Sequence, residues 1–85
     1  MEKRLNELSI NQKGKVTDIY GQQELIKKFL DMGIIRGTEI EVVKVAPLGD
    51  PIDIKIRGYH LSLRRNEAIN ISVMVLNKEE RIWKK

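Results

Sequence analysis

Residues 52–63 read IDIKIRGYHLSL, and this stretch decides the fold. Apolar residues stand at every second position in both halves, a pattern typical of strands with one buried face. Gly58 and Tyr59 between the halves suit a two-residue type II′ turn, which takes glycine at its first central position. The stretch therefore predicts an antiparallel hairpin with one apolar face. The pairs expected across it are Ile56 with Leu61, Ile54 with Leu63, and Asp53 with Arg64.

Three further stretches are rich in β-branched residues and predict strands. Residues 15–20 lose strict alternation, so we expect a bulge or an early end near Asp18. Residues 38–45 change their buried face midway, which indicates a bent strand. Residues 71–75 place β-branched apolar residues at every second position and predict the last strand. Together with the hairpin, these stretches give about five short strands.

A single α-helix is predicted over residues 22–32. Its apolar residues recur at helical spacing from Leu25 to Met32. Gly21 can serve as the N-cap, and Gly33 stands where a left-handed C-cap belongs. Five strands and one helix predict a small β-barrel closed on itself, with the helix plugging one end or packing on a side. Closure is expected because an open sheet of this size would leave exposed edges.

The two ends of the chain carry weaker patterns. Leu5, Leu8 and Ile10 lie at spacings that fit either a helical turn or a loose apolar clamp. Residues 78–85 are polar and charged around one tryptophan, and we expect a mobile tail there. The remaining residues, 1–77, are expected to form a single domain.

Composition excludes several classes of protein. A chain of 85 residues has room for one domain, and the absence of cysteine excludes disulfides and thiolate metal sites made by this chain alone. The formal net charge is +4, but residues 5–77 hold ten basic and nine acidic side chains, so no nucleic-acid partner is expected. Neither an apolar signal core nor a membrane-spanning stretch is visible, and we expect a soluble cytosolic protein.

Side chains suited to catalysis or metal binding are sparse. Ser62 and His60 could share one face of a strand, but a surface pair explains them better than a catalytic one. The glycines at 33 and 37 lack the following Lys-Ser/Thr of a phosphate-binding loop. We therefore expect no enzymatic activity. The possible oxygen and imidazole ligands, none at a recognisable ligand spacing, are Asp50, Asp53, His60 and Glu67.

The loop at residues 46–51, with the sequence APLGDP, is the most informative surface segment. Two prolines stiffen it, and a stiff loop loses less entropy when it docks to a partner. Leu48 has no clear phase with the core, so it either points outward or folds back onto it. Two interpretations also remain for residues 32–36: they either cap the helix or contact a partner. The residues expected to form or shape a partner contact are Pro47, Leu48, Gly49, Asp50, Pro51, Met32 and Arg36.

Several segments form an ordered set along the chain: FLDMGI at 29–34, RGTEI at 36–40, APLGDPI at 46–52 and LSLR at 61–64. This set resembles the FeoA family of ferrous-iron transport accessory proteins. The likeness extends over about residues 5–76, nearly the whole chain. Arg36 stands where members usually have proline before the glycine, which should loosen that turn.

The resemblance implies an SH3-like β-barrel with a helix inserted after the first strand, in agreement with the pattern-based prediction. It also implies a cytosolic accessory protein whose partner is FeoB, a GTP-driven ferrous-iron permease. Similar domains end the metal-dependent repressors of the diphtheria-toxin-repressor type, but this chain has no winged-helix segment, so only the accessory role carries over. The alternative is a small module that binds or senses Fe²⁺ or Mn²⁺ through the ligands named above.

Overall fold

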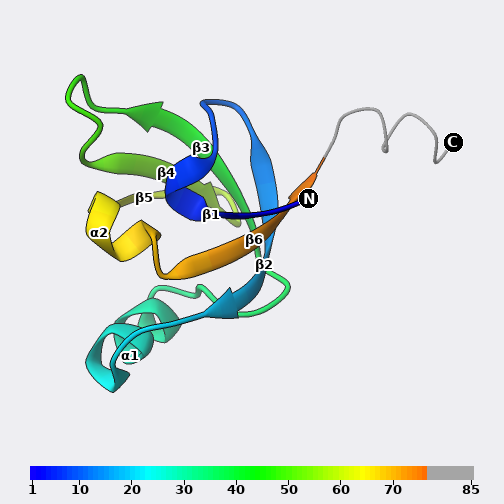
Figure 1. Ribbon diagram of the computed structural model, residues 1–85, viewed down its shortest axis with the longest axis vertical. Coiled ribbons are helices and arrows are strands. Elements are labelled where there is room, and N and C mark those ends of the chain that lie inside the picture. Colours follow the sequence, from blue (N-terminus) through cyan, green and yellow to red (C-terminus); the bar gives the residue numbers. More distant parts are fainter. Residues whose placement is uncertain (77–85) are drawn as a thin grey trace, which may run out of the picture.

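The computed structural model describes residues 1–76, and Figure 1 shows their arrangement. The mostly β fold with one longer inserted helix is confirmed. The predicted tail at 78–85 lies outside the described residues. In chain order the elements are β1 (Glu2–Arg4), the 3-10 helix η1 (Leu5–Glu7), β2 (Lys13–Ile19), α1 (Gln23–Asp31), β3 (Glu39–Val45), β4 (Ile52–Ile56), β5 (Tyr59–Leu63), α2 (Arg65–Ala68) and β6 (Ile71–Leu76).

All six strands belong to one antiparallel sheet, in the order β1-β6-β2-β3-β4-β5. The helix was expected after the first strand, the one predicted at residues 15–20. This strand is β2, because β1 precedes it, so α1 follows the second strand. The prediction of a closed sheet is wrong, because β1 and β5 form the two ends and do not pair with each other within residues 1–76. The reason is local: β1 has only three residues, and the chain then turns into η1, which contacts α2 instead of continuing along the sheet.

Two register shifts in the sheet agree with the expected bulge near Asp18 and with the expected bend within residues 38–45. The pairing of β2 with β6 shifts between Val16 and Asp18, and the pairing of β3 with β4 shifts between Val42 and Lys44. A bulge bends its strand and increases the local twist. The open sheet therefore curves into a small barrel-like domain, which is visible in Figure 1.

β4 and β5 form the predicted hairpin, but in a register that differs by two residues. The turn consists of Arg57 and Gly58, with φ of 50° and 89°. Two positive φ values define a type I′ turn, whereas the predicted type II′ turn has only one. A shift of two residues keeps every apolar side chain on its face, so the expected core is unchanged. The observed pairs are Ile56 with Tyr59, Ile54 with Leu61, Ile52 with Leu63, and Asp53 with Ser62.

α1 is one residue shorter at each end than predicted. Gln22 is its N-cap residue in place of Gly21. At the other end, Gly33 has a φ of 85°, as expected for a left-handed C-cap. The N–H of Ile34 donates to the carbonyl of Phe29 at 2.9 Å, which completes a Schellman motif. This motif directs the chain back toward the core.

The core is one cluster of buried side chains from the sheet, α1, η1 and α2. Leu8 is buried whereas Ile10 is half exposed, so the N-terminal apolar residues belong to the core only in part. Gly14 allows close packing of β2, because a Cβ atom there would lie 2.6 Å from Val73 Cγ2. The buried hydrophobic residues are Leu5, Leu8, Val16, Phe29, Ile34, Ile40, Val42, Ile52, Ile54, Ile56, Leu63, Ala68, Ile71, Val73 and Val75.

Candidate functional site

The loop at residues 46–51 connects β3 to β4 and presents an apolar side chain to solvent. Leu48 at its tip is 96% exposed, so of the two expected orientations it has the outward one. Two backbone hydrogen bonds close the loop, from Gly49 N–H to the Ala46 carbonyl (2.7 Å) and from Ala46 N–H to the Pro51 carbonyl (3.1 Å). The loop is therefore a fixed turn that holds Leu48 away from the core.

A second set of contacts ties this loop to α2. Asp50 Oδ1 accepts a hydrogen bond from the backbone N–H of Arg65 at 2.9 Å. The Arg65 guanidinium lies against Gly49, where a Cβ atom would be 3.0 Å from Nη1. Gly49 has a φ of 87°, so both its backbone conformation and this close approach favour glycine. These contacts fix the position of the loop relative to α2.

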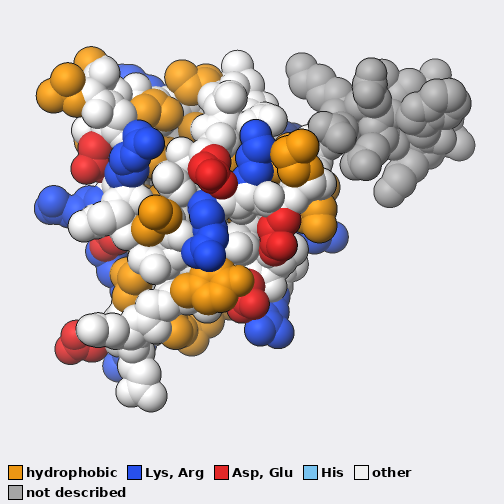
Figure 2. Space-filling model, in the orientation of Figure 1, with side chains coloured by type: hydrophobic (Ala, Val, Ile, Leu, Met, Phe, Trp, Pro, Cys, Tyr) orange, Lys and Arg blue, Asp and Glu red, His pale blue; other side chains and the backbone are white. Residues whose placement is uncertain are grey.

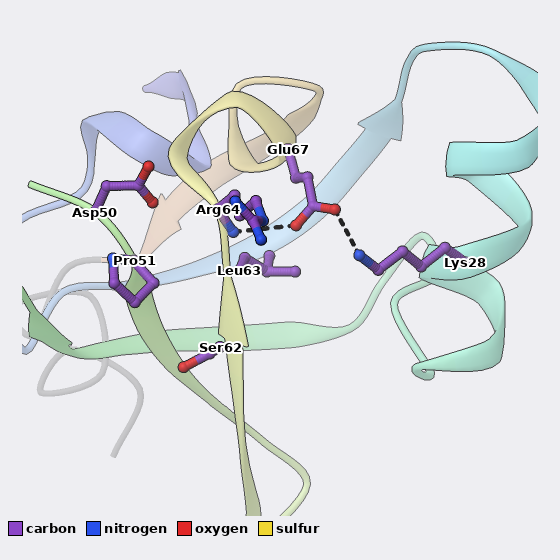
Figure 3. A pocket seen from close by; sticks show the side chains of 7 residues that line it. All are labelled: Lys28, Asp50, Pro51, Ser62, Leu63, Arg64 and Glu67. Atoms are coloured by element: carbon purple, nitrogen blue, oxygen red, sulfur yellow. Dashed lines mark hydrogen bonds and ion pairs between the residues drawn. The ribbon is translucent and has the colours of Figure 1, made fainter.

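An open cavity of about 450 Å³ lies beside the loop, next to α1, β5 and α2 (Figure 3). Asp50 and Pro51 of the loop form part of its wall, and the buried Leu63 supplies an apolar patch. The remaining lining is polar or charged and includes both signs of charge. The lining residues are Lys28, Asp50, Pro51, Ser62, Leu63, Arg64 and Glu67.

Glu67 joins α1 to α2 at this cavity (Figure 3). Its Oε2 accepts a hydrogen bond from Lys28 Nζ at 2.5 Å, and its Oε1 accepts one from the backbone N–H of Arg64 at 3.0 Å. The Lys28 ammonium, with the help of the Arg64 N–H, holds the pKa of Glu67 below its ordinary value of 4.5, although burial acts in the opposite direction. Glu67 is therefore ionised at neutral pH, and both of its oxygens are engaged.

The four candidate metal ligands do not converge. Asp50 and Glu67 line the same cavity, but each already accepts hydrogen bonds from protein groups. Asp53 accepts a hydrogen bond from Ser62 Oγ, and His60 is exposed on β5. In the part of the chain that the structure describes, no group of three or more His, Cys, Asp or Glu side chains is placed to hold a metal ion. The Ser62 hydroxyl also donates to a carboxylate and not to His60, unlike a nucleophile paired with an imidazole base.

Met32 and Arg36 lie on a different surface from the loop. The half-buried Met32 accepts a hydrogen bond at its carbonyl from the Tyr59 hydroxyl (2.8 Å), and Tyr59 follows the β4–β5 turn. Arg36 is exposed and forms an ion pair with Asp18 (3.3 Å). The 46–51 loop precedes β4, whereas Tyr59 follows the turn at the other end of that strand (Figure 1). The predicted contact residues therefore form two separate groups.

The sequence interpretation missed the cavity residues contributed by α1 and by the end of β5. Lys28 belongs to the face of α1 that the pattern assigns to solvent, and no local feature links it to Glu67, 39 positions later. Ser62 and Arg64 are polar positions of the hairpin in the pattern, and nothing local indicates that they line a cavity with Lys28. In Figure 2 the hydrophobic side chains of the viewed face are scattered among charged ones, with one group at the corner that the 46–51 loop occupies.

Within residues 1–76, no helix has the length and apolar character needed to cross a bilayer.

Known proteins similar to this chain match nearly all of its described residues. A family model described as the FeoA domain matches residues 3–75. The Fe(2+) transport protein A/Fe(2+) transporter FeoB fusion protein of Porphyromonas gingivalis is 36% identical over 74 residues, which cover 87% of this chain and 9% of the fusion protein. A FeoA-like protein from Clostridium acetobutylicum matches with a TM-score of 0.83 and 48% identity, over 91% of this chain and 90% of that chain.

A more distant structure bears on the fold alone. FeoA of Stenotrophomonas maltophilia, described as a procaryotic SH3 domain protein, matches with a TM-score of 0.71 and 22% identity, over 86% of this chain and 88% of that chain. The SH3-like fold is thereby confirmed. Because the FeoA model spans residues 3–75, nearly all of the described chain, this protein belongs to the FeoA family, which is associated with ferrous-iron transport.

Proposed function

We propose that this chain is a non-enzymatic cytoplasmic accessory protein of ferrous-iron uptake, which binds and modulates a FeoB-type GTP-driven iron permease. The Porphyromonas gingivalis relative supports this role, because there a region similar to this chain belongs to the same polypeptide as FeoB. Covalent fusion keeps two domains at a high effective concentration and so favours their association. Such an association needs a binding surface on this domain.

The observation that carries the proposal is the exposed Leu48 on a fixed turn. A large aliphatic side chain contributes about 1.5–3 kcal/mol when a partner buries it. The loop hydrogen bonds already hold the turn in one conformation, so docking costs little further entropy. Met32 and Arg36, on the other surface, would contact a second region of the partner. The contact residues proposed at the loop are Pro47, Leu48, Gly49, Asp50 and Pro51.

Titration calorimetry with the cytosolic domain of the permease tests this surface. Leu48→Asp is expected to weaken binding by at least about tenfold, because the interface would have to desolvate a carboxylate. Leu30→Asp is the matched control, since Leu30 lies on α1 outside the proposed surface and is 52% exposed. Equal affinities of wild type and Leu48→Asp would remove the loop from the interface.

The alternative function, a module that binds or senses Fe²⁺ or Mn²⁺, requires ligands that converge. Of the four candidate ligands, Asp50 and Glu67 line the same cavity, and Glu67 would have to give up its ion pair with Lys28 to ligate a metal. Anaerobic titration with Fe²⁺ separates the two functions. Saturable binding that Asp50→Asn and Glu67→Gln abolish would favour the metal module over the accessory role.

A further inference from the structure

The outer edge of β5 is an unpaired strand edge. Among the described residues 1–76, β5 pairs only with β4, through a hairpin whose turn has two residues. The residues that flank such a turn form a hydrogen-bonded pair, and this type of pair recurs at every second position of the ladder. The alternation directs the backbone N–H and C=O groups of His60 and Ser62 away from β4. Within residues 1–76, no other backbone hydrogen bond reaches them.

This edge lacks the features that usually protect strand edges. Exposed edges are commonly blunted by proline, by bulges or by shortness. β1, the opposite edge of the sheet, has only three residues and leads directly into η1. β5 has five residues, contains no proline, and pairs with β4 without a register shift. A regular open edge of this kind can accept an additional strand from another protein.

The two faces of β5 differ in what they offer to such a strand. On the inner face, Leu61 is only partly buried against the core, so a neighbouring apolar side chain would cover it. On the outer face, His60 and Ser62 are exposed. An added strand would therefore match this edge best with apolar and polar residues in alternation.

The exposed charges beside the outer face of this edge are positive. Lys55 lies opposite His60 in the hairpin, and Arg64 directly follows β5; both side chains are exposed. The nearby carboxylates of Asp53 and Glu67 each already accept a hydrogen bond from a neighbouring side chain, and Glu41, opposite Lys55 on β3, lies one strand further from the edge. An incoming segment would thus meet exposed cations next to carboxylates that are already hydrogen-bonded. This arrangement favours acidic residues in the segment.

We propose that the β5 edge binds an extended acidic segment of the partner protein, which adds one strand to the sheet. Backbone hydrogen bonds form to His60 and Ser62, apolar side chains of the segment lie beside Leu61, and acidic ones lie beside Lys55 and Arg64. The edge is continuous with the loop surface, because Ser62 and Arg64 line the same cavity as the loop residues 50 and 51 (Figure 3). The inference rests on the proposed function and names the kind of segment that is recognised.

Amide hydrogen exchange of the full chain, free and bound to the cytosolic domain of the permease, tests the pairing directly. The amides of His60 and Ser62 are expected to exchange fast in the free protein and to slow by at least about tenfold in the complex. Formation of a complex without this protection would overturn the strand addition and leave the proposed function standing. Failure to form any complex would overturn both.

A proline substitution at each edge of the sheet gives a matched pair of variants. His60→Pro removes an outward N–H that β4 does not use, so the hairpin is retained while strand addition is blocked. It is expected to weaken binding by more than about tenfold. Glu2→Pro is the control: Met1 C=O accepts from Val75, so the alternation directs the N–H of Glu2 outward on β1. Equal losses for both variants, or no loss for either, would contradict the proposal.

A charge reversal checks the acidic character of the segment and does not depend on proline. Lys55→Glu is expected to weaken binding several-fold at low salt and less at high salt. Lys15→Glu, at an exposed position of β2 and two strands further from the β5 edge than Lys55, is the control and should bind like the wild type. Identical affinities for the two variants would show that the segment is not acidic. A Leu48→Asp variant that still binds with protected β5 amides would remove the loop from the interface and keep the edge.

Discussion

The two loops that flank β3 use their apolar residues in opposite ways. In the loop at 33–38, before β3, Ile34 is fully buried; in the loop at 46–51, after β3, Leu48 is 96% exposed. Both loops contain glycines with positive φ and both are closed by backbone hydrogen bonds, so rigidity does not distinguish them. The difference lies in direction: Ile34 follows the Schellman end of α1 and enters the core, whereas Leu48 stands at the tip of a turn between two strands.

The comparison indicates how an apolar loop residue can be assigned to folding or to binding. Ile34 stabilises the domain and is expected to tolerate little change. Leu48, at 96% exposure, packs little against the described fold, which agrees with the contact role proposed for it above. The predictions below test both halves of this contrast.

The largest expected effect is on Ile34. Ile34→Ala removes a fully buried side chain and leaves a cavity beside α1, which should lower the free energy of unfolding by about 2–5 kcal/mol. Urea denaturation followed by circular dichroism measures this. Ile35→Ala, at the exposed neighbouring position, is the control and should change stability by less than about 0.5 kcal/mol. Similar losses at the two positions would show that the loop at 33–38 is not anchored through Ile34.

The next effect concerns the hydrogen bonds inside the same loop. Thr38 is 4% exposed; its Oγ1 accepts a hydrogen bond from Ile35 N–H (3.3 Å) and donates one to the carbonyl of Gly33 (3.4 Å). Thr38→Val leaves these groups without a partner and should cost about 1–3 kcal/mol. Thr17→Val, which removes a hydrogen bond at an exposed site, should cost less. If Thr38→Val lowers the free energy of unfolding by less than Thr17→Val does, the hydrogen bonds of Thr38 do not stabilise the loop at 33–38.

A third prediction depends on pH and concerns the ion pair between Glu67 of α2 and Lys28 of α1. The 46–51 loop is hydrogen-bonded to α2 through Asp50. The pKa of Glu67 is lowered in the folded state by the Lys28 ammonium, so its contribution to stability is present above the unfolded value of about 4.5 and is lost as the pH falls through the lower folded pKa. Glu67→Gln should therefore cost about 1 kcal/mol at pH 7 and less at pH 3.

Denaturation of the wild type and Glu67→Gln at both pH values measures this difference. Asp31→Asn, at an exposed carboxylate of α1, is the control and should show little change at either pH. A loss from Glu67→Gln that is the same at pH 7 and pH 3 would mean that the charge of Glu67 does not stabilise the link between α1 and α2.

The sequence predicted those elements whose pattern is local. Alternation identified β4 and β5, and its breaks predicted a bulge near Asp18 and a bend within residues 38–45, where the register shifts are found. The hairpin register was wrong because it depends on the φ of Arg57, and a positive φ is uncommon for a residue other than glycine. β1 and the open edge were missed because a strand of three residues carries too short a pattern.

The candidate site could be predicted only in part for a similar reason. The prolines and glycine of the 46–51 loop mark a turn locally, and they led to Leu48. The cavity beside it depends on Lys28 and Glu67, which belong to different helices and meet only in the folded chain. Whether Leu48 points outward also depends on tertiary structure, because neither strand period continues through the loop.

The smallest expected effect completes the contrast between the loops. Leu48→Ala removes a side chain that is 96% exposed, so the free energy of unfolding should change by less than about 0.5 kcal/mol. Binding of the permease domain should nevertheless weaken, because a partner that buries the leucine loses about 1.5–3 kcal/mol of apolar contact. Urea denaturation and titration calorimetry on the same preparation measure both. If Leu48→Ala instead lowers stability by more than about 1 kcal/mol and leaves binding unchanged, Leu48 acts within the fold as Ile34 does, and the assignment of the 46–51 loop to binding is wrong.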